Sequence, residues 1–111
     1  MKALADPTIE VSAASTMTPT SPSRLSPEIF GPIESITKEL FGDIPVIPVM
    51  STGATDSRSF RRVGIPAYGV SGLFGDPDDA RAHGRDERMS VKWFYEGQEF
   101  LYRLTKALAA K

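Results

Sequence analysis

The sequence has no cysteine and a single histidine, and each shortage excludes a class of site. Without cysteine the chain cannot form disulfides, use a thiolate nucleophile or build a zinc site on sulfur, so a metal would have to bind imidazole and carboxylates. With one histidine in a charged segment, no Ser-His-Asp arrangement is supported. The glycines match neither a P-loop nor a dinucleotide fingerprint, which excludes these two phosphate-binding motifs.

Excess charge of one sign and long apolar runs are also lacking. The 13 Lys and Arg residues and 14 Asp and Glu residues give a formal net charge of −1, which provides no general attraction to nucleic acid or anionic membranes. No apolar run approaches the roughly 20 residues that cross a bilayer, and residues 1–6 lack the apolar centre of a signal peptide. We therefore expect a soluble chain without a nucleic-acid or membrane partner, in a compartment that the sequence does not identify.

What the sequence does contain fits one modest globular domain of the α/β class. With 111 residues, 41% of them hydrophobic and 24% charged, the composition is that of an ordinary folded protein. The hydrophobic pattern predicts, in chain order, a strand at 8–13, an extended Ser/Thr/Pro-rich crossing at 15–27, a helix at 27–41, a strand at 44–50, a short helix at 55–63, a strand at 65–70, a charged loop at 71–88 and a closing helix after Ser90. The order strand, helix, strand predicts a βαβ unit.

The two long helices have the clearest sequence signals. Ser26 and Pro27 are typical of an N-cap and a first helical position, although Gly31 and Pro32 also allow a start at Pro32. Gly42 is typical of the residue that follows a helix end. The predicted core face of the closing helix comprises Trp93, Gly97, Phe100, Leu101, Leu104 and Leu108.

Two apolar segments predict buried strands. Residues 44–50 form a continuous apolar run that is too short for a typical helix, and residues 65–70 have a similar character. Pro45 and Pro48 indicate irregular ends or an edge position, because proline donates no backbone hydrogen bond.

The only histidine, His83, is a candidate metal ligand. It lies in the charged loop, and Asp76, Asp78 and Asp79 precede it. Imidazole and carboxylate are the natural zinc ligands of a chain without cysteine. The alternative is that His83 is simply solvated and that the aspartates form a charged loop surface.

A second candidate is the small-residue turn from Ser51 to Arg58, which follows a predicted strand and opens a predicted helix. In open α/β sheets, ligands bind beyond the carboxyl ends of the strands, where a helix start also offers free amides. Arg58 would then bind a carboxylate through two hydrogen bonds. The alternative is that Thr55 or Asp56 caps the helix and Arg58 is a surface charge.

These features follow one another in a specific order. After a predicted buried strand come Gly53-Ala54-Thr55-Asp56-Ser57-Arg58, then Gly64-Ile65-Pro66-Ala67-Tyr68-Gly69, then His83-Gly84-Arg85-Asp86-Glu87-Arg88, and finally an amphipathic helix. Over residues 8–109 this order resembles the carboxy-terminal part of the M20 family of zinc metallopeptidases, most closely its carboxypeptidase-like and dipeptidase-like members. The resemblance implies that residues 1–20 are the end of a lid or dimerisation domain with its linker, and that residues 21–111 belong to the catalytic domain.

The resemblance also implies roles for individual residues. His83 matches the last metal ligand of the family, and Arg58 matches the arginine that holds the terminal carboxylate of the substrate. Gly53 and Ala54 would line the same pocket with backbone groups. The complete family enzyme holds two zinc ions and hydrolyses a peptide or N-acyl-amino-acid amide bond next to a free carboxylate. Its lid domain commonly mediates dimerisation, so the resemblance also allows a homo-oligomer.

The chain departs from the family pattern in one large respect. The other metal ligands of the family come from a His-x-Asp motif, a bridging Asp and a Glu-Glu pair followed by a further carboxylate, and the glutamate pair supplies the general base. None of these motifs occurs in this sequence, and His83 is followed two residues later by Arg85. Since one ligand cannot hold a catalytic zinc, we expect a carboxy-terminal segment that is inactive without the amino-terminal catalytic half. The alternative is a non-catalytic α/β fragment or association module.

Overall fold

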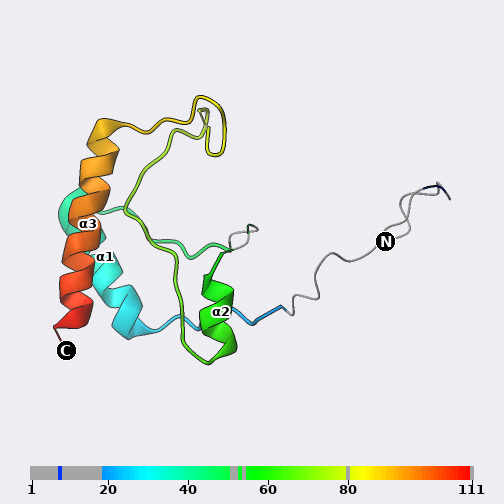
Figure 1. Cartoon of the computed structure of the whole chain (residues 1–111). Helices are drawn as coiled ribbons and strands as arrows, with labels where there is room; N and C mark the ends of the chain where they lie inside the picture. The colour runs from blue at the N-terminus through cyan, green and yellow to red at the C-terminus, as the bar shows by residue number, and fades with distance from the viewer. Residues whose placement is uncertain (1–7, 9–18, 51–52, 54, 80, 111) are drawn as a thin grey trace.

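A computed structural model describes residue 8 and residues 19–50, 53, 55–79 and 81–110, and three helices occur in this part of the chain. They are α1 (Pro27–Phe41), α2 (Ser57–Arg62) and α3 (Val91–Ala109). Figure 1 shows α1 and α3 side by side, with α2 apart from them on the long excursion of chain that joins the two. None of these described helices combines the length and the apolar character that a membrane span requires.

α1 begins and ends at the predicted residues. Ser26 has an extended backbone, and its carbonyl accepts the first hydrogen bonds of the helix, from the amides of Ile29 and Phe30 at 3.0 and 2.8 Å. Gly42 has a φ of 84°, and its amide bonds to the Lys38 carbonyl at 3.1 Å, which closes the last turn. The helix thus starts at Pro27, and Pro32 lies inside it.

The core of the described chain lies between α1 and α3. Ile33 and Ile36 from α1 pack against Phe100 and Leu104 from α3, and all four side chains are buried. Half-buried hydrophobic side chains surround this cluster, namely Ile29, Leu40, Phe41, Val46, Val70 and Leu108. The predicted face of α3 is therefore confirmed at its centre. Leu101 is the exception: it remains 41% exposed, because it lies one position beyond Phe100 and turns away from α1.

The chain around Gly72 and Leu73 crosses α3, and this close crossing requires two glycines, one on each side of the contact. A side chain at Gly72, where φ is 62°, would overlap the ring of Phe100, and one at Gly97 would overlap the side chain of Leu73. The backbone near residue 72 and the helix therefore approach more closely than larger residues would allow. Phe74 then packs edge-on against Phe41, with ring centroids 4.8 Å apart.

The predicted α/β class with a βαβ unit is wrong, because the structure has no strand in the residues that it describes. Residues 44–50 and 65–70 are irregular segments without a ladder partner. Their prolines remove backbone donors, and much of the first segment faces solvent: Ile47, Val49 and Met50 are 70%, 87% and 85% exposed. Of the predicted strand at 8–13, only Thr8 lies within the described residues, and it is in a turn.

The predicted helix at 55–63 is shorter than expected and is tied to the Pro-rich crossing. α2 covers Ser57–Arg62 alone. The Ser23 hydroxyl donates to the Ala67 carbonyl and accepts from its amide, both at 2.9 Å. The Tyr68 hydroxyl donates to the Arg24 carbonyl at 2.6 Å, and Arg61 donates to the Thr20 hydroxyl at 3.1 Å. The described part of the crossing therefore runs along residues 61–68.

Candidate functional site

The loop before α3 is built from two tight turns. In the first, the Asp76 carboxylate accepts from the amide of Asp78 at 2.9 Å, and the Asp79 amide donates to the Asp76 carbonyl at 3.2 Å. In the second, the Gly84 amide donates to the Arg81 carbonyl at 2.9 Å. Small polar side chains at such positions hydrogen-bond the local backbone, which explains why this segment turns instead of extending.

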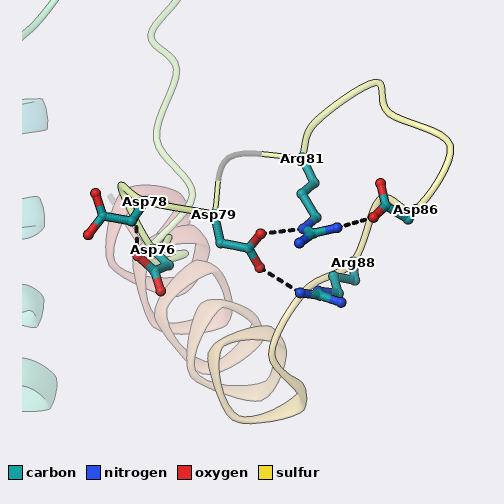
Figure 2. Close-up of polar contacts among 6 residues, drawn as sticks. All are labelled: Asp76, Asp78, Asp79, Arg81, Asp86 and Arg88. Atoms are coloured by element: carbon teal, nitrogen blue, oxygen red, sulfur yellow. Dashed lines mark hydrogen bonds and ion pairs between the residues drawn. The ribbon is translucent and has the colours of Figure 1, made fainter.

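Four charged side chains join these turns into one network, which we call the loop clamp and define as Asp79, Arg81, Asp86 and Arg88. Arg81 donates from Nε to one carboxylate oxygen of Asp79 and from Nη1 to Asp86. Arg88 donates to the other oxygen of Asp79 at 2.9 Å. Figure 2 shows Asp79 facing both arginines, whereas Asp78 points away from them.

Asp79 is the member of the loop clamp whose ionisation is changed. The hydrogen bond from Arg81, followed by that from Arg88, lowers the pKa of the Asp79 carboxyl below its ordinary value. Positive charge beside a carboxylate favours its ionised form, and this outweighs the opposing effect of partial burial. Asp79 is therefore an acceptor that stays charged throughout the neutral range.

His83 lies at the tip of the second turn in an unusual conformation. Its φ is 64°, and it is the one non-glycine residue with a positive φ in the described chain. A side chain in this left-handed region costs about 1–2 kcal/mol relative to an ordinary conformation. The imidazole is exposed, so it faces outward from the loop.

The described residues do not complete a metal site around His83. They contain no group of three or more His, Cys, Asp or Glu side chains that could hold a metal ion, whereas a catalytic zinc takes three protein ligands. Asp79 and Asp86 bond to arginines, and the Asp76 carboxylate accepts from the backbone of the loop. These residues therefore do not fit a zinc ion without further ligands.

The predicted carboxylate-binding residue, Arg58, lies in the first turn of α2. Its side chain is half-buried, and its amide approaches the Thr55 carbonyl at 3.4 Å. Gly53 lies in an exposed bend before the helix. Ala54, the third predicted substrate-binding residue, lies outside the described residues.

The structure does not bring the two predicted site residues together. In Figure 1, α2, which carries Arg58, lies near the bottom of the view, and the yellow loop, which carries His83, lies near the top. Both residues lie on the excursion between α1 and α3 and not in the packed pair of long helices. Within the described chain, the two residues predicted to bind substrate carboxylate and metal therefore lie in separate segments.

Sequence reasoning missed the loop clamp. The sequence pattern presents Asp79 as a possible zinc ligand or as part of a charged surface, and it indicates no role for Arg81 or Arg88. The available signal was the alternation of charge from Asp79 to Arg81 and from Asp86 to Arg88. That signal shows that ion pairs can form, but spacing in a loop does not determine which partners meet.

The chain is similar to a known protein family and to a known enzyme. The model of a family described as "Peptidase family M20/M25/M40" matches residues 7–107. Aminoacylase-1 of Pongo abelii is 40% identical over 63 residues, which make up 57% of this chain and 15% of that relative. The aligned part of the chain thus corresponds to a small portion of aminoacylase-1.

Proposed function

Because this chain belongs to peptidase family M20/M25/M40, which confirms the family resemblance of its sequence, we propose that it contributes the carboxy-terminal part of the catalytic domain of a zinc-dependent hydrolase. The proposed reaction is hydrolysis of a peptide or N-acyl-amino-acid amide bond next to a free carboxylate. The observation that carries this proposal is the family match, which spans almost the whole chain. The similarity to aminoacylase-1 favours an acylated amino acid among these substrates.

In this proposal Arg58 binds the carboxylate of the substrate. A guanidinium remains charged at all relevant pH values and presents paired donors that match a carboxylate. Its half-buried position at the start of α2 supports this role, because partial removal from water strengthens such a contact. Gly53 and Ala54 would line the same pocket through their backbone groups.

His83 would contribute one imidazole to a zinc site completed by residues outside the described part of the chain. Its exposure supports this role, since an outward imidazole is accessible to a second segment or domain. The general base would also come from elsewhere, in an amino-terminal catalytic half. We therefore expect the isolated chain to be inactive on N-acetylated amino acids.

A chimaeric enzyme tests the role of Arg58. In it, this chain replaces the matching segment of aminoacylase-1, and hydrolysis of an N-acetyl amino acid is measured. We expect Arg58→Ala to lower kcat/KM by about 10- to 100-fold, the range for loss of a hydrogen bond to a charged group. Arg62→Ala, an exposed arginine on the same helix, is the matched control and should change kcat/KM less than twofold.

The same chimaera tests His83. His83→Ala should reduce bound zinc and turnover together, whereas Arg58→Ala should leave the zinc content unchanged. An Arg58→Ala chimaera with unaltered kinetics would contradict the assignment of the carboxylate-binding residue. An active His83→Ala chimaera with a full complement of zinc would contradict the metal role.

A second candidate function, an association module without catalysis, is favoured by one observation. Apolar side chains at Ile47, Val49 and Met50 are largely exposed, although they lie next to each other along the chain. Contiguous exposed apolar surface is typical of an interaction site. The partner would be another copy of the chain or the amino-terminal half of the enzyme.

A further inference from the structure

We propose that Asp79 is a positioning residue that holds His83 in its left-handed conformation through Arg81 and Arg88. Both oxygens of the Asp79 carboxylate are used, each by a different arginine. One of these arginines begins the turn that carries His83, and the other follows that turn. Asp79 therefore connects the two ends of the turn.

The backbone conformation of His83 needs a restraint from the surrounding residues. Left-handed backbone is unfavourable for a residue with a side chain, and it persists only where the surroundings impose it. Among the described residues of the turn, a backbone hydrogen bond joins the Gly84 amide to the Arg81 carbonyl at 2.9 Å. A single backbone bond in an exposed loop provides little restraint, because water competes for both groups.

The loop clamp supplies the missing restraint on both sides of the turn. Arg81 binds Asp79 before it and Asp86 after it, so its guanidinium spans the turn. Arg88 closes the second link back to Asp79. Isolated surface ion pairs contribute little, but here several charges share partners, and the Asp79 and Arg81 side chains are only 33% and 32% exposed.

The consequence is that the Cα–Cβ bond of His83 points in one direction before anything binds the imidazole. A ligand residue fixed in advance loses less conformational entropy when its partner arrives. Use of that imidazole rests on the proposed function. The positioning itself depends only on the described loop, and the two are therefore separable by experiment.

The test compares Asp79→Asn with Asp78→Asn in the complete chain. Asp78 is the matched control because it is adjacent in sequence but points away from both arginines (Figure 2). Backbone ¹⁵N relaxation gives order parameters for residues 81–88, and carbon chemical shifts report the φ of His83. We expect Asp79→Asn to lower the order parameters from about 0.85 to below about 0.6, with His83 returning to negative φ. Asp78→Asn should leave both unchanged.

Two further measurements separate positioning from general stability and from the proposed function. The urea midpoint of global unfolding should fall only slightly in Asp79→Asn, because the core between α1 and α3 stays intact, and Asp79→Glu should restore part of the loop order. In the aminoacylase-1 chimaera, Asp79→Asn should lower kcat about tenfold while KM changes less than twofold. Unchanged order parameters in Asp79→Asn would overturn the positioning role. If Asp79→Asn loses the order of the loop but keeps its kcat, the result would support the positioning role of Asp79. It would also contradict the proposed role of His83 as a metal ligand.

Discussion

At the scale of single residues, the ionisation of Asp79 depends on the two arginines that the loop places beside it. Asp79 accepts hydrogen bonds from Arg81 and Arg88, and these bonds lower its pKa. A carboxyl group with a lowered pKa in the folded state stabilises that state at pH values above its unfolded pKa. This contribution is lost as the pH falls through the folded pKa. The loop clamp is therefore complete at neutral pH and opens in acid.

The hydrogen bonds from Arg81 and Arg88 should be visible in the titration of Asp79. The ¹³C shift of its carboxyl carbon, followed against pH, should show a midpoint below the ordinary aspartate value. Arg88→Gln should move that midpoint upward, because one of the two donors that favour the ionised carboxylate is removed. An ordinary midpoint in the parent chain, or the same midpoint in Arg88→Gln, would show that these arginines do not control the charge of Asp79.

Residue type and local sequence context indicate His83 and Arg58 as candidate site residues. The chain has a single imidazole, and Arg58 stands out among its arginines because it follows a small-residue turn. The partners of Asp79 were not predictable in the same way. They depend on how residues 76–79 and 81–88 fold back on themselves, and any of several arginines could have met that carboxylate.

At the scale of elements, helices were predictable and extended segments were not. A helix satisfies its backbone through local bonds, so the caps at Ser26 and Gly42 and the apolar periodicity define α1. A strand needs a partner that lies elsewhere, and the runs at 44–50 and 65–70 have none in the described chain. The apolar character of these segments indicates that they favour burial. It does not show whether a second strand is present to pair with them.

The crossing of the loop over α3 leads to a prediction for stability. Gly72→Ala should lower the free energy of unfolding by about 1–3 kcal/mol, because the new methyl group overlaps the Phe100 ring and the backbone there has positive φ. Gly75→Ala is the matched control, since nothing lies within 4 Å of its added methyl group. Its effect should stay within about 0.5 kcal/mol.

Urea unfolding followed by circular dichroism at 222 nm, which reports the helices, makes this comparison. Equal stability of Gly72→Ala and Gly75→Ala would mean that the loop does not press on Phe100.

At the scale of the whole molecule, the residues that the structure describes bury little apolar surface. The buried hydrophobic residues of the described chain are Ile33, Ile36, Phe100 and Leu104, whereas many large hydrophobic side chains remain exposed. Two packed helices with one shared face form a small core, and small cores give marginal stability. The chain is therefore expected to gain stability from any partner that covers the exposed segments.

We accordingly predict that the isolated chain self-associates as its concentration rises. Size-exclusion chromatography with light scattering at about 10 and 200 µM should show an increase in mean mass. The double variant Val49→Ser, Met50→Ser should reduce this increase, since both side chains are more than four-fifths exposed in the described structure, at 87% and 85%. A mass of one chain at both concentrations would argue against the association module.

The pairing of α1 with α3 also has a consequence for synthesis on the ribosome. The core joins Ile33 to Leu104, so α1 emerges long before its partner helix has been translated. Closing such a long loop is slow and entropically costly, and the apolar face of α1 stays uncovered meanwhile. Nascent chains that stop before α3 should therefore be bound by chaperones or degraded, and folding should begin only once residue 104 has left the exit tunnel.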